Sequence, residues 1–323
     1  MAARSSSILR RALLYVPASS PRMLTKSLGL ASDNITYDLE DSVTPSAKPQ
    51  ARDALRTHLR DLPSRPPSIF ELAVRINAVS TPHALDDLAA LAPLPNVDAV
   101  VLPKVSGASD LTFLADALRH LAPARHDPSS PEHYNPVKIV ALIESARAVM
   151  DLREICGATP LLSGLIFAAE DFALDLSLTR TPGLSEFLYA RSAIVTAARA
   201  AELPSAIDLV CTSYKGDEGL ARLDEECRGG KAMGFNGKQC IHPSQVETVQ
   251  RLFAPSEKEV EWAVRCTIAD EKAATAGRGA WTLDGAMIDA PVAGKATAIV
   301  DKAQRCGLDV NSLRDKWKDQ EPE

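Results

Sequence analysis

The fold of this chain is predicted by two short stretches, Lys138-Ile-Val-Ala-Leu-Ile-Glu144 and Gly164-Leu-Ile-Phe-Ala-Ala-Glu-Asp171. Each is a run of mostly apolar residues that ends in a carboxylate. Such a run, followed by a helical pattern, is typical of a strand buried on both faces of a parallel sheet. Parallel α/β folds build their sites at the carboxyl ends of the strands. We therefore expect Glu144 and Asp171 to form a hard oxygen site for a divalent cation, with Mg2+ as the natural candidate.

The same alternation of strand-like and helical patterns recurs along the chain. It predicts an α/β fold, a TIM (β/α)8 barrel over residues 12–254. An open doubly wound sheet is the alternative, but no Gly-rich dinucleotide fingerprint follows any of the runs. The predicted strands are Ala12–Pro17, Ile35–Glu40, Phe70–Asn77, Ala99–Lys104, Lys138–Glu144, Ser163–Asp171, Ala206–Thr212 and Gly234–His242, and the helices between them include Pro45–Leu62, Ala84–Leu91, Asp110–Leu121, Ser145–Ile155 and Ser185–Leu203.

Two further segments flank the predicted barrel. Residues 255–323 exceed what a barrel needs and are expected to form a C-terminal helical extension or lid, with helices at Ser256–Ala276 and Val292–Cys306. Residues 1–11 form an N-terminal tail that contains Arg4, Arg10 and Arg11 but no acidic residue. This composition suits a mitochondrial targeting segment. A cytoplasmic location is the alternative, because the first strand begins so early.

The bulk composition excludes several classes of function. The 323 residues have a net charge of −6 and a pI near 5.6, which argues against a nucleic-acid partner, whose footprint is basic. No apolar run reaches the length of a membrane span. The six cysteines show no CxxC spacing. They are expected to be reduced and buried, and not to form a disulfide frame or a zinc site.

Basic residues also lie near predicted strand ends. The planar fork of Arg75 suits a substrate carboxylate or a developing enolate oxygen, while a structural ion pair with Glu40 or Asp41 is the alternative. Lys104 could form a Schiff base, but beside a carboxylate pair it is expected to neutralise the acidic site or to contact a phosphate.

The run Asp38-Leu-Glu-Asp41 places three carboxylates at one strand end, where they repel unless cations or donors offset them. We expect Glu40 and Asp41 to orient metal-bound waters or a neighbouring arginine. The alternative is that Asp41 or Ser42 caps the next helix.

The loop after the first strand carries Arg22 and Lys26, close to a predicted helix N-terminus. An anionic group is welcome there, so both are candidates for substrate binding. Plain surface charges are the alternative.

The last candidate is Asp289, which has apolar neighbours in Met287-Ile-Asp-Ala-Pro291. An acid in this position can act as a proton shuttle. A helix cap before Pro291 is the competing interpretation. For His242 we expect a structural hydrogen-bonding role.

Taken together, these residues resemble the citrate lyase beta subunit-like family of the HpcH/HpaI aldolase superfamily. The resemblance covers almost the whole chain in order and is strongest to the stand-alone citrate lyase beta-like and malyl-CoA lyase branch. The matching pieces are Leu14-Tyr-Val-Pro17, Pro21-Arg22, Tyr37-Asp-Leu-Glu-Asp41, Val74-Arg-Ile-Asn77, Leu102-Pro-Lys104, Ile143-Glu-Ser-Ala146, Ala169-Glu-Asp171, Gly234-Phe235, Gly237-Lys-Gln-Cys-Ile-His-Pro-Ser-Gln245 and Gly285-Ala-Met-Ile-Asp289-Ala-Pro291.

The resemblance implies a TIM barrel with Mg2+ held by Glu144 and Asp171, and substrate contact by Arg75. It also implies a catalytic acid/base at Asp289, delivered on a lid from a neighbouring subunit of a homotrimer. The implied substrates are an acyl-CoA and a small 2-oxo acid. One departure bears on substrate identity: relatives of the mitochondrial branch often carry an acidic residue at the seventh strand end, where this chain has Val210-Cys-Thr-Ser-Tyr-Lys215.

The function expected is a Mg2+-dependent carbon–carbon lyase or synthase that acts on a 3-hydroxyacyl-CoA thioester of the malyl-CoA or citramalyl-CoA type. The reaction would be an aldol or Claisen-type cleavage, or condensation with glyoxylate or pyruvate. Three alternatives stay open: a metal-dependent aldolase of free 2-oxo acids, the citrate lyase beta subunit of a complex, and a non-catalytic paralogue.

Overall fold

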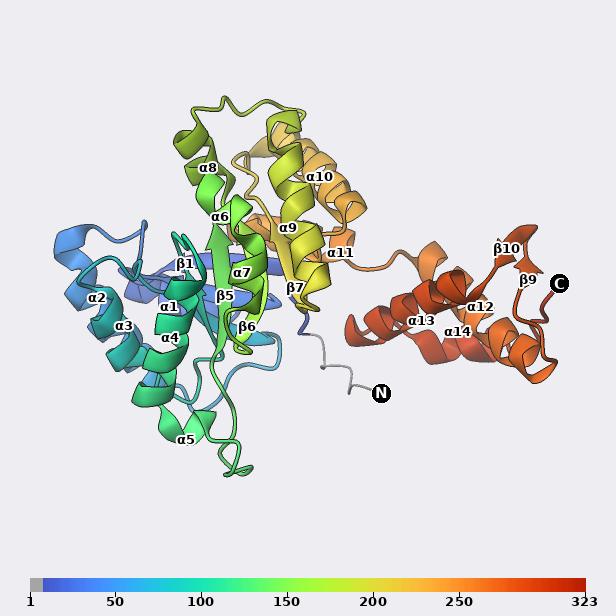
Figure 1. The fold of residues 1–323 in the computed structure, drawn as a ribbon, viewed down its shortest axis with the longest axis horizontal. Helices are drawn as coiled ribbons and strands as arrows, with labels where there is room; N and C mark the ends of the chain where they lie inside the picture. The colour runs from blue at the N-terminus through green and yellow to red at the C-terminus, as the bar shows by residue number, and fades with distance from the viewer. Residues whose placement is uncertain (1–7) are drawn as a thin grey trace. The chain divides into compact units, whose positions relative to one another are not determined.

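Eight parallel strands close into a barrel in the computed structural model, which describes residues 8–323 (Figure 1). Each strand pairs with the next along the chain, and β8 pairs with β1 to close the circle. This confirms the predicted TIM barrel. The strands are β1 Ala12–Pro17, β2 Asn34–Asp38, β3 Glu71–Arg75, β4 Ala99–Leu102, β5 Lys138–Ile143, β6 Leu162–Phe167, β7 Ser205–Asp208 and β8 Gly237–Cys240.

Helices surround these strands (Figure 1). The longer ones, such as α2, α4 and α9, bury one face. Helix α4, for example, buries Leu111, Leu114, Ala115 and Leu118, the spacing of one helical face. The elements are α1 Pro21–Ser27, η1 Pro45–Ala47, α2 Lys48–Arg60, α3 Ala84–Leu91, α4 Ala108–Leu121, α5 Pro123–His126, α6 Ala146–Met150, α7 Leu152–Gly157, α8 Ala169–Leu176, η2 Ser185–Phe187, α9 Leu188–Ala200, α10 Gly216–Met233, η3 Pro243–Gln245 and α11 Val246–Phe253.

The barrel interior is filled by side chains, because alternate residues of each strand point inward. The cluster there consists of Leu13, Ala73, Ala99, Val101, Val140, Leu142, Ile166 and Ile207, and every member is at most 1% exposed. The interior is therefore a packed core, which leaves only the strand ends and their loops for chemistry.

The predicted boundaries were wrong at several strand ends, most importantly at β6. The last sheet bond there runs from the Ala168 N–H to the Ile143 carbonyl, and helix α8 begins at Ala169. Glu170 and Asp171 therefore lie in the first turn of α8 and not in a strand. The reason is that acidic residues interact favourably with the partial positive charge of a helix N-terminus.

The amino-terminal ends of the strands are closed by a buried arginine. Arg10 is 1% exposed, and its guanidinium binds Glu71 at 2.6 and 2.7 Å, together with Ser163 and Ser205. Arg11 pairs with Asp33 at 2.8 Å. The prediction of a tail is therefore wrong for residues 10 and 11, which belong to the barrel. The remaining basic residue of the predicted targeting segment, Arg4, lies outside the described residues.

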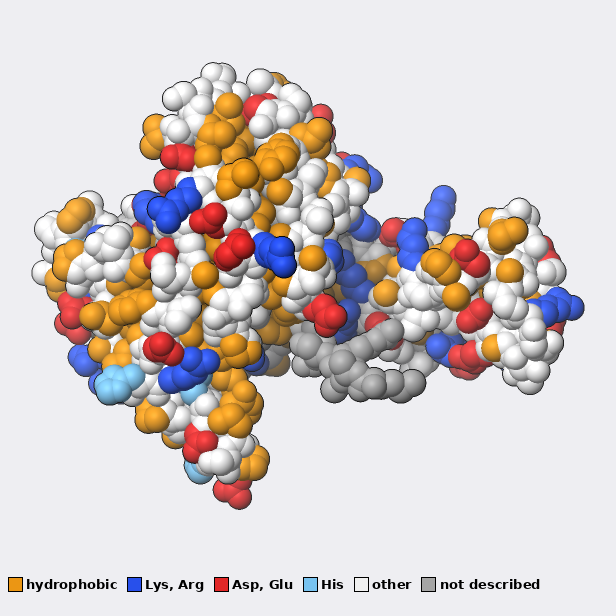
Figure 2. Space-filling model, viewed as in Figure 1, with side chains coloured by type: hydrophobic (Ala, Val, Ile, Leu, Met, Phe, Trp, Pro, Cys, Tyr) orange, Lys and Arg blue, Asp and Glu red, His pale blue; other side chains and the backbone are white. Residues whose placement is uncertain are grey.

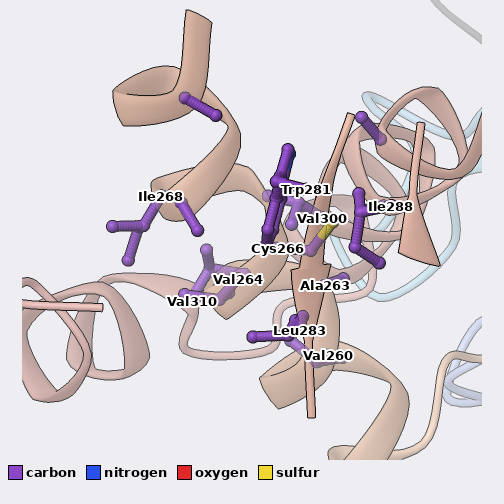
Figure 3. Close-up of a cluster of buried hydrophobic side chains, with 14 of the residues drawn as sticks. Val260, Ala263, Val264, Cys266, Ile268, Trp281, Leu283, Ile288, Val300 and Val310 are labelled. Carbon is purple, nitrogen blue, oxygen red and sulfur yellow. The ribbon is translucent and has the colours of Figure 1, made fainter. Parts of the chain in front are cut away.

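The chain forms two compact units, one up to Arg251 and one from Leu252 to Glu323. The second contains the predicted C-terminal helical extension. Its core joins α12, α13 and a small β-hairpin, with Val260, Val264 and Trp281 among the buried side chains (Figure 3). The elements are α12 Glu257–Thr275, β9 Trp281–Leu283, β10 Ala286–Ile288, α13 Ala290–Arg305 and α14 Val310–Lys316.

The hairpin of this second unit turns at Asp284-Gly285, where both residues have positive φ, 52° and 78°. Such a pair is the strongest local signal for a two-residue hairpin turn, because the left-handed backbone matches the strand twist. The hairpin ends at Ile288 and so delivers the chain directly to Asp289 and helix α13. Within residues 8–323, the structure contains no helix that combines the length and apolarity needed to span a bilayer.

Candidate active site

Most of the predicted site residues come together at the carboxyl ends of neighbouring barrel strands. Arg75 is the last residue of β3, and Glu144 follows β5 directly. Lys104 lies in the loop after β4, and Asp171 lies in the helix that follows β6. The barrel geometry thus gathers side chains that are up to 96 positions apart in the sequence.

Arg75 is held in a fixed orientation by Asp38, the last residue of β2. The two residues are register partners, and Nε and Nη2 of Arg75 each donate to a carboxylate oxygen of Asp38 at 2.7 Å. The Arg75 Nη1 atom lies 3.1 Å from Glu40 and 3.5 Å from Asp41. Beneath it, the Tyr15 ring centroid is 4.7 Å from the guanidinium carbon. The ion-pair alternative for Arg75 is therefore present in the structure, with Asp38 as an additional partner.

The loop that carries Glu40 and Asp41 is organised by the same Asp38 carboxylate. Asp38 accepts the backbone N–H groups of Glu40 at 2.9 Å and Ser42 at 3.1 Å. Neither Asp41 nor Ser42 caps a helix, since Thr44 occupies the N-cap position of η1. That alternative was wrong, and both Glu40 and Asp41 instead face the Arg75 guanidinium.

Lys104 lies at the centre of a cluster of carboxylates. Its ammonium nitrogen is 2.7 Å from Oε1 of Glu40, and 3.7 Å from both Oε2 of Glu144 and Oδ1 of Asp171. The two predicted metal ligands thus converge on one positively charged point. Their exposure differs, because the Glu144 side chain is 5% exposed and that of Asp171 is 43% exposed.

Burial makes Glu144 an unusual carboxylate. Desolvation raises its pKa to about 7, and burial also raises the pKa of Glu40. For Asp38, burial opposes ionisation but the Arg75 hydrogen bonds and charge lower the pKa below its ordinary value. The Oε2 atom of Glu144 accepts no hydrogen bond from the described residues although it is buried. A buried carboxylate oxygen with spare bonding capacity is the kind of group that a hard cation would satisfy.

The residues present fit Mg2+. In the described part of the chain, no three His, Cys, Asp or Glu side chains are grouped so that they could hold a metal. Glu144 and Asp171 would therefore act as a pair. Mg2+ is commonly bound by one or two carboxylates, with water and substrate oxygens as the other ligands.

A cavity of about 440 Å³ opens beside this cluster, a size that suits a small organic acid. Its lining combines the charged Asp38, Arg75 and Asp171 with the apolar Leu142 and Val210. A second hollow of about 290 Å³ is lined by Lys104, Glu144 and Asp171, among others. Asp171 borders both spaces.

The sequence interpretation missed two polar residues of the cavity, Tyr15 and Gln239. The Tyr15 hydroxyl donates to Gln239 Oε1 at 3.0 Å, and Gln239 Nε2 donates to the carbonyls of Phe167 and Asp208. Burial raises the pKa of Tyr15, which keeps it neutral as a donor. Tyr15 lies in the motif Leu14-Tyr-Val-Pro17 and Gln239 in Gly237-Lys-Gln239. These motifs were the sequence signal that could have identified the two residues.

Three other candidates belong to other elements of the chain. Arg22 and Lys26 are exposed residues of the seven-residue helix α1 and line neither of the two spaces. Asp289 belongs to the second unit, where it is half-buried and caps α13 by accepting the Val292 N–H at 3.2 Å. The helix-cap interpretation of Asp289 is therefore confirmed, and its role as a proton carrier stays a prediction.

His242 has the structural role expected of it. Its Nδ1 atom accepts the Ser244 N–H as the cap of η3, and its ring stacks on Tyr214 with centroids 4.8 Å apart.

The sequence of residues 11–243 matches the family model described as HpcH/HpaI aldolase/citrate lyase. The chain belongs to this family. It is accordingly an enzyme, a carbon–carbon lyase. One relative is the citrate lyase subunit beta of Leuconostoc mesenteroides subsp. cremoris, 34% identical over 91% of this chain and 93% of that protein. Another is the mitochondrial citramalyl-CoA lyase of Homo sapiens, 33% identical over 88% of this chain and 83% of that protein.

Solved structures of the same family share the architecture. CitE from Mycobacterium tuberculosis, in complex with magnesium, acetoacetate and coenzyme A, has a TM-score of 0.70 and 31% identity. The match covers 91% of this chain and 98% of that one. The citrate lyase beta subunit from the same organism, complexed with oxaloacetate and magnesium, has a TM-score of 0.60 and 32% identity over 76% of this chain and 96% of that one. These likenesses agree with the barrel described above.

Proposed function

We propose that this lyase is Mg2+-dependent and acts on a 3-hydroxyacyl-CoA thioester of the malyl-CoA or citramalyl-CoA type. It would release or condense glyoxylate or pyruvate as the 2-oxo acid. The observation that carries this proposal is the convergence of Glu144 and Asp171 on one cationic point, next to a cavity that also contains Arg75. The magnesium, acetoacetate and coenzyme A of the CitE complex support it.

Glu144 and Asp171 would hold the metal. When bound, Mg2+ supplies Lewis-acid polarisation of a substrate carbonyl. Asp38 and Tyr15 would keep Arg75 rigid, and Glu40 and Asp41 would act as its supporting residues. Nε and Nη2 of Arg75 donate to Asp38, whereas Nη1 makes ion pairs with Glu40 and Asp41 without a hydrogen bond to either, so Nη1 is the atom that would stabilise negative charge on a substrate oxygen. Arg22 and Lys26 remain proposed contacts for an anionic part of the substrate.

Asp289 is proposed as the acid/base. It would remove the methyl proton of the acyl-CoA in the synthetic direction and return it after cleavage. We further propose that it acts from a lid supplied by another copy in a homotrimer. Hydrophobic side chains gather on the face formed by α6, α8 and α9, where Met150, Leu174, Leu188 and Tyr189 are 56–81% exposed (Figure 2). An apolar face of this kind supports association between copies.

The decisive experiment is mass-spectrometric turnover of a panel by the purified enzyme. The panel holds malyl-CoA, citramalyl-CoA and free 2-hydroxy acids, each with Mg2+ and with EDTA. We expect EDTA-sensitive cleavage of a CoA thioester to a 2-oxo acid and a shorter acyl-CoA. Cleavage of free acids alone would favour the aldolase alternative and overturn the proposal. Activity only with a carrier-bound substrate would favour a citrate lyase complex, a candidate kept open by the relatives with that name.

The role of Asp289 is tested by Asp289→Asn, because asparagine caps helices as well as aspartate does. A matched control is Asp309→Asn, since Asp309 caps α14 in the same way by accepting the Ser312 N–H at 3.0 Å. We expect Asp289→Asn to abolish turnover with Mg2+ affinity almost intact, and Asp309→Asn to be close to wild type. Full activity of Asp289→Asn would contradict the assignment.

The proposal that Asp289 is supplied by another subunit is tested by mixing two inactive variants, Asp289→Asn and Glu144→Gln, under conditions that allow subunit exchange. If the acid/base comes from a different subunit than the metal ligands, mixed oligomers contain some complete sites and activity returns. If both come from the same chain, every site stays incomplete and the mixture stays inactive. Size-exclusion chromatography with light scattering measures the oligomeric state in parallel.

The location of the enzyme is proposed to be mitochondrial, with a cytoplasmic location as the alternative. The mitochondrial relatives support the first, and the bacterial relatives fit the second. Because Arg10 and Arg11 are needed in the barrel, a fluorescent fusion of the full chain is compared with an Arg4→Ala variant. Loss of mitochondrial signal is expected if residues 1–9 act as an address.

A further inference from the structure

Lys104 has an unusual backbone conformation for a lysine. Its φ is 53°, in the left-handed region that L residues other than asparagine, aspartate and histidine seldom occupy. It follows β4 in Leu102-Pro-Lys104, at the end of the barrel where the carboxylates gather. Strained backbone of this kind persists only where the surrounding structure holds it, and it concentrates at functional sites.

The Lys104 side chain lies among three carboxylates. Its ammonium nitrogen is 3.7 Å from Glu144 and 3.7 Å from Asp171. Its shortest contact is with Glu40, at 2.7 Å. One residue therefore contacts three carboxylates, one tightly and two loosely.

We propose that Lys104 is a positioning residue whose ammonium acts as a built-in counter-cation for Glu144 and Asp171, and that Mg2+ displaces it from these two while it stays paired with Glu40. The inference rests on the proposed function, since it assumes that Glu144 and Asp171 bind the metal. The unequal distances support it. The contact with Glu40 has hydrogen-bond length, whereas the two at 3.7 Å are ion pairs without a hydrogen bond.

The sign of the effect on Mg2+ affinity follows from Coulomb repulsion. Mg2+ binds carboxylate oxygens at about 2.0–2.1 Å, so it would approach the two oxygens that the ammonium now faces. Mg2+ bound to these oxygens and the Lys104 ammonium would be close neighbours, and two positive charges a few ångströms apart repel strongly at a protein surface. Removal of the ammonium also leaves the carboxylates without their internal counter-charge. Both consequences favour the metal, so the wild-type lysine should weaken Mg2+ binding compared with a neutral residue.

The test measures Mg2+ binding by isothermal titration calorimetry at pH 8, without substrate. Lys104→Met removes the charge and keeps most of the side-chain stem, and Lys104→Asn removes the charge with a residue that tolerates a left-handed backbone. We expect both to bind Mg2+ about tenfold more tightly than wild type. Lys104→Arg keeps the charge and should stay within about threefold of wild type. Lys258→Met, at an exposed position of α12, is the control for loss of one positive charge.

A second measurement is the thermal midpoint of each protein with EDTA and with saturating Mg2+. The neutral variants should melt lower than wild type without metal and gain more from Mg2+. Unchanged or weaker Mg2+ binding in both neutral variants, with normal binding by wild type, would overturn the role of Lys104 and leave the proposed function standing. Absence of Mg2+ binding by wild type would instead overturn the metal site, and with it both proposals.

Discussion

The two ends of this barrel differ in how their charged side chains are paired. At the amino-terminal end, every nitrogen of the Arg10 guanidinium donates to Glu71, Ser163 or Ser205, and Asn34 donates to the same Glu71 at 2.6 Å. At the carboxyl-terminal end, two cations, Arg75 and Lys104, face five carboxylates. Those carboxylates are Asp38, Glu40, Asp41, Glu144 and Asp171.

The electrostatic outcome differs accordingly. Although burial opposes its ionisation, Glu71 has a lowered pKa because of the charge and hydrogen bonds of Arg10. Glu144 is similarly buried, yet its pKa is raised because its partners do not compensate the desolvation. A satisfied buried ion pair stabilises the fold, whereas a buried carboxylate whose desolvation is not compensated is a candidate for a functional role. This contrast predicts that mutations at one end change stability and those at the other change function.

The largest expected effect is on activity, from Glu144→Gln or Asp171→Asn. Each removes one proposed metal ligand, and loss of the metal costs several kcal/mol of barrier, or about 10³-fold or more in kcat/KM. Calorimetry should show Mg2+ binding lost as well. Asp116→Asn is the control, because Asp116 pairs with Arg119 on the outer helix α4 and lines neither of the two spaces. Normal Mg2+ binding by both variants would contradict a functional role for the carboxyl-terminal end of the barrel.

The next effect is on stability, from Arg10→Met at the closed end. It leaves Glu71 buried without a counter-charge, which costs about 3–5 kcal/mol in the free energy of unfolding. Urea denaturation measures this, and the Mg2+ affinity of the folded variant should stay near wild type. The control is Arg56→Met, because the Arg56–Asp53 pair is exposed and its loss should cost less than about 1 kcal/mol. A small effect at Arg10 would mean that the two ends do not differ.

A smaller effect concerns pH and the metal-free protein. Since the folded pKa of Glu144 is about 7 and its ordinary value is 4.5, the folded state binds the extra proton between these values. The stability contribution of this group is therefore fully present below about pH 4.5 and is lost as pH rises to 7, by up to roughly 3 kcal/mol. Urea titrations in EDTA should show that Glu144→Gln flattens this slope. An identical slope in the variant would remove Glu144 as its cause.

The smallest effect is expected from Tyr15→Phe. The phenyl ring keeps its place under Arg75, so only the hydroxyl bond to Gln239 is lost. The loss of one neutral hydrogen bond costs about 1 kcal/mol of stability. Turnover should fall no more than severalfold, since Asp38 still holds the guanidinium. A drop as large as that for Glu144→Gln would show that the hydroxyl itself takes part in the chemistry.

Much of this molecule could be predicted from local pattern. The buried strands were found because apolar runs alternate with helical stripes, and the barrel follows from that alternation. Glu144 and Asp171 were singled out because they follow buried runs, although Asp171 proved to lie in a helix. Asp289 was recognised both as a candidate acid and as a cap, and the cap was confirmed.

Contacts between residues on different strands were harder to predict from the sequence. The pairing of Arg75 with Asp38 depends on strand register, and the burial of Arg10 depends on β1, β3, β6 and β7 meeting at one end. Arg10 looked like part of a basic tail because composition records a charge and not its environment. Lys104 at φ 53° could not be foreseen either, since a single residue's backbone angle is set by the contacts around it.

The sequence by itself determined the class of fold, the position of most strands and the identity of the charged side chains available for chemistry, because hydrophobic periodicity and residue type are local properties. Only the tertiary structure decided which charges are neutralised and which remain free to bind. That distinction depends on distances and burial among residues far apart in the chain, and electrostatic energy is a function of those two quantities.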